Sequence, residues 1–260
     1  MGTYDLLTFG DEEALAQTAA AQWLKQLETA GRRAGPYCVA LSGGRIARRF
    51  LLAVRDQVRA RRLDLGRVHF FWGDERCVPP DNPESNFGLA NECLLGPLGI
   101  AGGQVHRIRG EALPEAAAAE AEAGLRRIAP PGKGGQPALD LVFLGMGEEG
   151  HVASLFAGEA EELRASPAVY RPVTAPKPPP RRITLGYPAI RAAGQVWVLA
   201  SGPGKAAALR QSLTPAGNTP LARVLRQRRH TRILTDLALD AIFQKNRRLH
   251  LTGGGSDGKE

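Results

Sequence analysis

Short apolar runs alternate along the chain with longer stretches whose apolar positions recur every three or four residues. Between residues 11 and 30, Leu15, Ala19, Trp23 and Leu27 fall on one face of a helix. The apolar runs predict strands at Tyr4–Phe9, Tyr37–Leu41, Val68–Trp72, Leu139–Leu144, Ile183–Leu185, Gln195–Ala200 and Thr231–Leu234. Helices are predicted at about 11–30, 45–62, 84–95, 114–128, 187–193, 203–213, 218–226 and 236–245.

This alternation predicts a single-domain α/β fold with a mostly parallel sheet and helices on both faces, a modified Rossmann-like arrangement. The runs Leu141–Leu144 and Val196–Ala200 are apolar throughout, as expected for strands buried on both faces. The proline-rich stretch Pro176–Pro180 is interpreted as a stiff loop within the domain rather than a hinge. The domain is expected to cover residues 1–252, followed by a disordered tail at 253–260.

The amino-acid composition indicates which class of ligand to expect. The formal charge is +8, which favours an anionic partner. Nucleic acid is not expected, because the two arginine clusters lack interleaved aromatic residues and are interpreted as solvated faces. These clusters are Arg59, Arg61 and Arg62, and Arg226, Arg228, Arg229 and Arg232.

The three cysteines, Cys38, Cys77 and Cys93, show neither C-x-x-C pairing nor zinc spacing, which fits a reducing cytoplasm. No signal peptide and no membrane-length apolar run is visible. We therefore expect a cytoplasmic protein without a membrane partner.

The most informative segment follows the predicted strand Leu139–Leu144. A glycine-rich turn there holds Glu148, Glu149 and His151, and a helix is expected to follow it. Ligands of α/β proteins bind at the carboxyl ends of strands, so a histidine beside two carboxylates at this position predicts an acid–base centre. The alternative is a tight turn with a capped surface histidine.

The same turn matches the dinucleotide fingerprint G-x-G-x-x-G through Gly145, Gly147 and Gly150. Two acidic residues lie inside the match and would face a pyrophosphate of the same charge. No nicotinamide or flavin cofactor is therefore expected.

Two other strand ends carry groups suited to an anion. Ser42, Gly43 and Gly44 precede a predicted helix, where glycines allow close backbone approach and the helix start offers free N–H groups. Ser201–Lys205 resembles a phosphate loop but lacks the Walker pattern, so nucleotide hydrolysis is disfavoured while Lys205 can still bind a phosphate.

The segment Asp74-Glu75-Arg76 lies at a further strand end, and Arg76 can bind a phosphate or carboxylate with two parallel hydrogen bonds. The alternative here is a local salt-bridge cluster, with Asp81 or Ser85 capping a helix. The sequence contains no G-x-S-x-G elbow and no H-E-x-x-H pair, so neither a serine hydrolase nor a protein-bound metal is expected.

Taken together, these segments resemble the 6-phosphogluconolactonases, in the superfamily shared with glucosamine-6-phosphate deaminases. The matching stretches are Leu41–Gly44, Phe71–Gly88, Leu139–Phe156, Arg182–Leu185 with Pro188, and Val198–Lys205. The most specific are Gly-Asp-Glu-Arg-x-Val-Pro…Ser-Asn-x-Gly and Gly-Met-Gly-x-x-Gly-His-x-Ala-Ser-Leu-Phe.

The resemblance implies hydrolysis of 6-phospho-D-glucono-1,5-lactone, in the pentose phosphate pathway, without a cofactor. It implies that His151 activates water and that Glu149 orients or stabilises the imidazole. The phosphate or nearby oxygens would be held by Ser42, Gly43, Gly44, Asp74, Arg76 and Lys205. We expect a small sugar-phosphate substrate as the partner, and a monomer or weak homo-oligomer.

Three positions depart from the family pattern. Arg45-Ile46 stands where Ser/Thr-Pro is usual, Glu149 stands where Asp is common, and Ala157 replaces a proline. Two alternatives stay open: an amino sugar phosphate isomerase/deaminase, and a non-catalytic sugar-phosphate sensor. The sequence Ala153–Phe156 favours the lactonase, because deaminases resemble Ala-Phe-Asn-Glu there.

Overall fold

The computed structural model describes residues 2–30 and 35–239. Its main layer is a six-stranded sheet in the order β1-β9-β8-β5-β2-β3, in which every pairing is parallel. The strands are β1 (Thr3–Thr8), β2 (Tyr37–Leu41), β3 (Val68–Trp72), β5 (Leu141–Gly145), β8 (Gln195–Ala200) and β9 (His230–Thr235). The predicted α/β class with a parallel sheet is confirmed.

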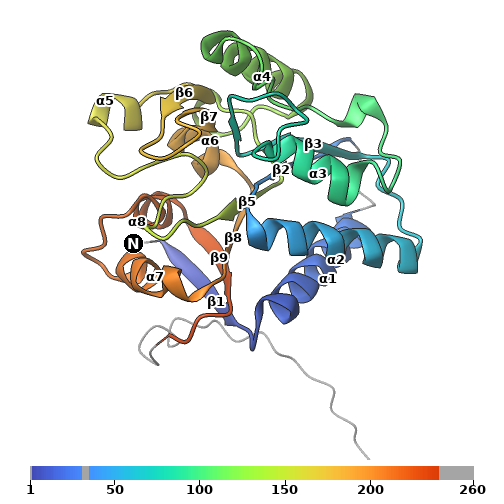
Figure 1. Cartoon of the computed structure of the whole chain (residues 1–260), viewed down its shortest axis with the longest axis horizontal. Helices are drawn as coiled ribbons and strands as arrows, with labels where there is room; N and C mark the ends of the chain where they lie inside the picture. The colour runs from blue at the N-terminus through green and yellow to red at the C-terminus, as the bar shows by residue number, and fades with distance from the viewer. Residues whose placement is uncertain (1, 31–34, 240–260) are drawn as a thin grey trace, which may run out of the picture.

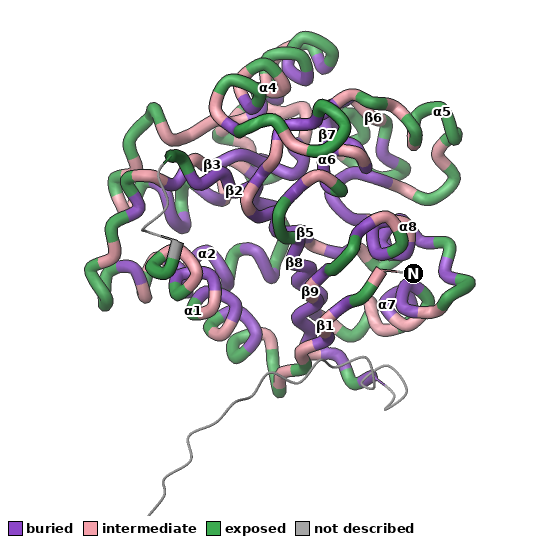
Figure 2. The backbone as a smooth tube through the Cα atoms, turned by 180° about the vertical axis from the view of Figure 1, so that it is seen from behind, coloured by how far each residue is buried: buried purple, intermediate pink, exposed green. Residues whose placement is uncertain are grey.

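Helices cover both faces of this sheet (Figures 1 and 2). On one face α1 (Glu12–Ala30) packs against α2 (Arg45–Arg61), and on the other lie α7 (Ala206–Leu213) and α8 (Pro220–Gln227). Between the first pair and the sheet, Phe143 of β5 packs edge-on against Trp23 and Trp197, with ring centroids 5.4 and 5.7 Å apart. Both faces of the central strands are therefore buried, which explains their continuous apolar runs.

A second, antiparallel sheet of three strands lies beside the main one. It has the order β4-β7-β6, formed by β4 (Asp74–Arg76), β7 (Arg181–Leu185) and β6 (Tyr170–Thr174). The helix α4 (Pro114–Ile128) packs on β6 and β7 (Figure 1). The Tyr170 hydroxyl donates a 2.8 Å hydrogen bond to the Trp72 carbonyl, which ties the small sheet to the end of β3.

The remaining elements are short. They are α3 (Asn86–Ala90) with a π-helical turn at Asn91–Leu95, α5 (Glu161–Arg164), α6 (Tyr187–Ala192), and 3-10 turns at Gly102–Gln104, Lys133–Gly135 and Pro203–Lys205. No helix within the described ranges is long and apolar enough to cross a membrane.

Several sequence predictions are confirmed and others are wrong. Pro176–Pro180 is the loop that joins β6 to β7, inside the domain as expected. The helix expected directly after His151 does not form: residues 151–156 make bridges instead, Met146 with Val152 and Val152 with Leu155. β4, β6 and α5 were not predicted. Residues 236–239 are not helical, and the rest of that predicted helix and the predicted tail lie outside the described residues.

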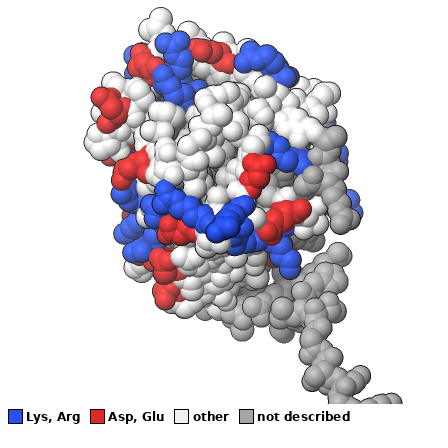
Figure 3. All heavy atoms as spheres, turned by 90° about the vertical axis from the view of Figure 1, so that its right-hand side faces the viewer, with Lys and Arg blue, Asp and Glu red and all other residues white. Residues whose placement is uncertain are grey.

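The first arginine cluster is solvated, as predicted. Arg59, Arg61 and Arg62 are exposed, and Arg61 pairs with Glu28 of α1. On the side of the molecule that faces right in Figure 1, positive and negative side chains are interspersed (Figure 3).

The second arginine cluster confirms the prediction only in part: Arg226 and Arg229 are exposed, whereas Arg232 is partly buried and Arg228 is buried. Arg228 is 7% exposed, and its guanidinium donates to the carbonyls of Ile190, Ala193 and other residues that end α6. Burial lowers the pKa of Arg228 to about 10, so the side chain stays charged at neutral pH. Carbonyls at a helix end need donors, and this distant side chain supplies them.

We expect Arg228→Met to lower the free energy of unfolding by about 1.5–3 kcal/mol, because it leaves several buried carbonyls without a donor. Urea denaturation followed by circular dichroism measures this change. The matched control is Arg229→Met, whose side chain is exposed and which should stay within about 0.5 kcal/mol of the wild type. Equal stability of the two variants would contradict the capping role of Arg228.

Candidate active site

The polar segments predicted from the sequence meet at the carboxyl edge of the main sheet. The loops after β2, β5 and β8 lie side by side, because these three strands are neighbours in the order β8-β5-β2. The chain runs outward from β2 to β3 and then returns to place β5 on the other side of β2. This reversal is a topological switch point, where α/β sheets form a ligand crevice.

His151 lies in the loop after β5, and its position depends on a glycine. Its Nδ1 is 2.9 Å from Glu149 Oε2, while its Nε2 has no hydrogen-bond partner among the described residues. The ring packs directly on Gly147, where an added Cβ would be 1.9 Å from Cε1 of His151. Any larger residue at 147 would displace the imidazole. This glycine of the G-x-G-x-x-G match therefore makes room for the imidazole ring.

The pKa shifts in this pair have opposing causes. Burial lowers the pKa of His151 below its usual value, the hydrogen bond to Glu149 opposes this, and the charge of Lys177 adds to the lowering. For Glu149, burial raises the pKa, but its own backbone N–H, His151 and Lys177 together outweigh burial and lower it. The pair is thus a carboxylate beside a neutral imidazole at neutral pH. With its proton on Nδ1, that imidazole offers the Nε2 lone pair as a base.

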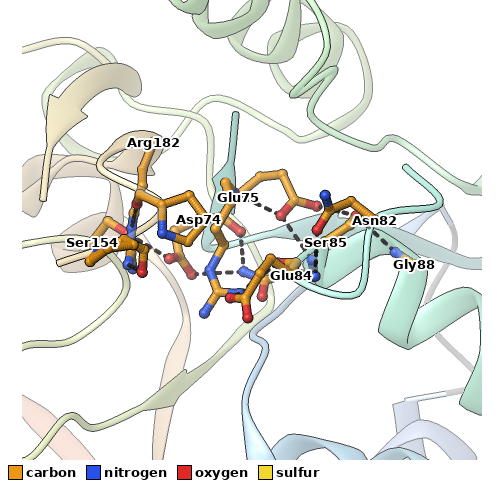
Figure 4. Close-up of polar contacts among 12 residues, drawn as sticks. Asp74, Glu75, Asn82, Glu84, Ser85, Gly88, Ser154 and Arg182 are labelled. Carbon is orange, nitrogen blue, oxygen red and sulfur yellow. Dashed lines mark hydrogen bonds and ion pairs between the residues drawn. The ribbon is translucent and has the colours of Figure 1, made fainter. Parts of the chain in front are cut away.

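The segment that follows His151 is fastened to the small sheet. The Ser154 hydroxyl donates to Asp74 Oδ2 at 2.7 Å, and its N–H donates to Thr184 Oγ1 at 3.1 Å (Figure 4). Ala153 just before it has a φ of 49°, an unfavourable value for a residue with a side chain. Tertiary contacts hold this strained turn, as is common at functional sites.

The two adjacent carboxylates on β4, Asp74 and Glu75, have different hydrogen-bond partners. Asp74 turns toward Ser154, whereas Glu75 turns to the opposite side of the strand and accepts the N–H groups of Asn86 and Phe87 (Figure 4). Burial raises the pKa of Glu75 to about 7, although these backbone donors oppose the shift. Ser85 caps α3 by accepting from Gly88 N at 3.0 Å. Glu75 and Ser85 therefore secure the start of α3.

Arg76 takes part in a local salt bridge. Its Nη1 donates to the Glu84 carbonyl at 2.5 Å and to Glu84 Oε2 at 3.2 Å. With Ser85 capping α3, this matches the alternative interpretation of the segment. The buried Nε of Arg76 has no partner in the described chain, so phosphate binding by Arg76 stays a prediction. The cross-strand partner of Arg76 is a second arginine, Arg182.

The loop after β2 is partly committed to the fold. The Ser42 hydroxyl donates to the Phe143 carbonyl at 2.8 Å, and the Asn86 side chain lies over Gly43. Gly44, with a φ of 93°, begins α2 without a side-chain cap, so the first N–H groups of this helix face outward. Ser42 can still accept a hydrogen bond, while backbone donors at Gly44 suit an anion.

Positively charged side chains lie close together where the loop after β2 meets the loop after β8. Arg45 of α2 reaches the β8 loop, since a Cβ on Gly202 would be 2.8 Å from its Nη2. Lys205 forms no ion pair with any carboxylate of the described ranges, and burial followed by the charge of Arg45 lowers its pKa. Asp236, followed by Glu148, which lies close to Gly204, opposes this lowering of the pKa. The half-buried Lys205 and the exposed Arg45 together favour binding of an anion.

Comparison with known proteins agrees with this geometry. Residues 10–234 match the family described as glucosamine-6-phosphate isomerases/6-phosphogluconolactonase. The 6-phosphogluconolactonase of Streptomyces coelicolor is 35% identical over 221 residues, covering 83% of this chain and 85% of that protein. The 6-phosphogluconolactonase of Mycobacterium tuberculosis is 38% identical over 207 residues, covering 77% of this chain and 82% of the relative.

The chain belongs to this family. The solved structure of 6-phosphogluconolactonase from Trypanosoma brucei superposes with a TM-score of 0.76 at 27% identity, covering 90% of this chain and 96% of that one. The fold is thus that of the glucosamine-6-phosphate isomerase/6-phosphogluconolactonase family.

In this family member the structure also reveals site residues that were not singled out from the sequence. Lys177 Nζ is 3.5 Å from Glu149 Oε1, and Arg182 lies over the Phe156 ring, which in turn packs on His151. Both residues belong to the β6–β7 hairpin. From the sequence alone, the run Pro-Lys-Pro-Pro-Pro-Arg-Arg predicts only a loop. Nothing in it indicates that the chain folds back over the loop after β5. No group of His, Cys, Asp and Glu in the described ranges could hold a metal ion.

Proposed function

We propose that this chain hydrolyses 6-phospho-D-glucono-1,5-lactone to 6-phospho-D-gluconate in the oxidative pentose phosphate pathway, with a water molecule activated by His151. The observation that carries the proposal is the imidazole at the switch point, with Nδ1 on Glu149 and with Nε2 left without a partner among the described residues. The relatives named 6-phosphogluconolactonase support the substrate.

The geometry suggests a simple route for the reaction. Nε2 of His151 takes a proton from water as the water oxygen attacks the lactone carbonyl, and Glu149 stabilises the imidazolium that forms. The tetrahedral intermediate then collapses with cleavage of the bond between C1 and the ring oxygen. The same Nε2 proton passes to the departing ring oxygen, which becomes a hydroxyl. The histidine is restored without a covalent intermediate.

Binding of the remote phosphate would position the carbonyl for this attack. Lys205 and Arg45 are the cations best placed for the phosphate, beside the uncapped start of α2 at Gly44. Arg45 replaces a hydroxyl residue of the family pattern, so in this chain a guanidinium contributes to phosphate binding. Arg76, engaged by Glu84, has a smaller part in this arrangement.

One observation bears on the alternative deaminase activity. Deaminases resemble Ala-Phe-Asn-Glu after the histidine, whereas this chain has Phe156 in place of the glutamate, 4.8 Å from the imidazole ring. An apolar ring at this position cannot act as a proton carrier. The sensor alternative differs from the lactonase by the absence of turnover.

The decisive assay follows hydrolysis of freshly made 6-phosphogluconolactone, with the spontaneous rate subtracted. The controls are unphosphorylated gluconolactone, for the contribution of the phosphate, and glucosamine 6-phosphate, for the deaminase alternative. Faster release of ammonia from the amino sugar than acid from the lactone would overturn the proposal. Location in the cytoplasm and a monomeric or weakly associating state stay predictions.

The pH dependence of the reaction should reflect His151. A protonated imidazole cannot accept a proton from water, so kcat/KM should fall as the pH falls through the pKa of His151. Burial lowers that pKa, which places the midpoint below the usual value of about 6.5. Glu149→Gln removes a negative charge that raises this pKa, and should move the midpoint lower still. A wild-type midpoint above about 7 would contradict this assignment.

A further inference from the structure

The loop between β6 and β7, residues 175–180, brings a second charged group to the catalytic pair. The Glu149 carboxylate lies between two partners: Oε2 is 2.9 Å from Nδ1 of His151, and Oε1 is 3.5 Å from Nζ of Lys177. These are its ion pairs within the part of the chain that the structure describes. One carboxylate therefore connects the histidine to a cation more than 20 residues further along the chain.

We propose that Lys177 is a positioning residue of the lactonase reaction: by holding Oε1 of Glu149, it keeps Oε2 on Nδ1 of His151 and leaves Nε2 for water. This inference rests on the proposed function. It assigns to Lys177 no contact with the reacting atoms, because the residue acts through the carboxylate.

The loop is built to present this lysine. The Ala175 N–H donates to the Pro180 carbonyl at 2.6 Å, which closes the loop, and Pro176 and Pro178 restrict the backbone on either side of Lys177. An exposed ion pair usually contributes little, because two long side chains must be ordered to form it. Here the backbone that carries Lys177 is already fixed, so the pair orders side chains alone and requires no ordering of the loop.

Arg182 connects the loop to the histidine by a second route. Its Nε donates to the Pro179 carbonyl at 2.9 Å, and its guanidinium is 5.7 Å from the centre of the Phe156 ring. That ring is 4.8 Å from the ring of His151. Arg182 is buried, and it lies beside Ser154 and Asp74 in the same cluster (Figure 4). The loop and the imidazole therefore share one rigid anchor.

The charges around His151 make the role of Lys177 measurable. The charged groups that act on the imidazole are Glu149 in its own loop, Lys177 in the β6–β7 loop and Asp74 on β4. After burial, which is the largest effect, Lys177 lowers the pKa of His151, whereas the two carboxylates raise it. Removal of the lysine charge should raise the pKa of His151, and a purely structural residue would not have this effect.

The test compares Lys177→Met and Lys177→Arg with the control Lys133→Met, an exposed lysine that precedes β5 at the opposite end of that strand. For Lys177→Met we expect kcat to fall about 2- to 5-fold with little change in KM. The acid midpoint of the rate profile should rise by roughly 0.3–0.7 pH unit. Lys177→Arg should restore both, and Lys133→Met should match the wild type.

A double-mutant cycle isolates the contact. In the Glu149→Gln background there is no carboxylate for the lysine to hold, so Lys177→Met should no longer lower kcat. An additive loss of kcat would show that the lysine acts elsewhere and would overturn the proposal. A rise in KM of about 10-fold or more with an unmoved midpoint would instead make Lys177 a phosphate ligand, and would also overturn it.

A measurement without substrate separates this inference from the proposed function. The chain has five histidines, and the His151 ring resonance is assigned as the one that His151→Gln removes. Its NMR titration should shift to higher pH in Lys177→Met. If the wild type fails to hydrolyse the lactone while this shift occurs, the proposed function fails and the contact stands. If hydrolysis occurs and neither kcat nor the titration changes, only the inference fails.

Discussion

His151→Gln should lower kcat/KM for 6-phosphogluconolactone by about 10²–10⁴-fold, the usual cost of losing a general base. Glutamine fits the space on Gly147 and can still donate to Glu149, but it cannot take a proton from water. Steady-state kinetics with the spontaneous rate subtracted measures the loss, and circular dichroism checks that the fold is intact.

The control for this variant is His230→Gln. His230 is half exposed on β9 and pairs with Asp5, at the opposite end of the sheet from the loop that carries His151. It should keep wild-type activity. If His151→Gln stays within about threefold of the wild type, proton transfer by His151 is not part of the rate-limiting chemistry.

Lys205→Met should raise KM for the phosphorylated lactone by about 10- to 150-fold, because a charge-assisted contact of about 1.5–3 kcal/mol is lost. Hydrolysis of unphosphorylated gluconolactone should change little, since that substrate has no group for the lysine to bind. The ratio of kcat/KM for the two lactones is the quantity to measure. Lys25→Met on the exposed face of α1 is the matched control.

Arg76→Met distinguishes the two interpretations of its segment. If Arg76 binds the phosphate, this variant should lose the same discrimination as Lys205→Met. If its main task is the bond to Glu84, discrimination should persist while thermal stability falls.

Equal slowing of both lactones by Lys205→Met would show that Lys205 serves the chemistry or the fold, and the phosphate assignment would be wrong.

Much of the main sheet follows from local pattern. β2, β3 and β8 form at the residues predicted, since an apolar run flanked by turn residues identifies a strand without knowledge of its neighbours. Their parallel arrangement follows from the helices between them. The polar strand ends at Ser42 and His151 were predictable for the same reason, because parallel strands bring their carboxyl ends to one edge.

The site itself depended on contacts between distant segments. The Ser42 hydroxyl donates to the Phe143 carbonyl, and the Arg76 guanidinium donates to the Glu84 carboxylate. The sequence indicates neither of these hydrogen bonds. Lys177 and Arg182 reach the loop that carries His151 because β7 pairs with β4, a strand of three residues too short to show a pattern.

Two predictions from the sequence were wrong for the same reason: the outcome depends on contacts with distant segments. The sequence predicted a helix after His151, yet Ser154 in that segment forms hydrogen bonds with Asp74 and Thr184, and no helix forms. Arg228 looked solvated, but the carbonyls that end α6 bind it in the interior. The periodicity of the sequence predicted the elements, and hence the α/β layers, the candidate catalytic histidine and the edge of the sheet where it lies. The tertiary structure alone decided which polar groups are free for a substrate, because hydrogen bonds between remote residues consume donors that appear free in the sequence.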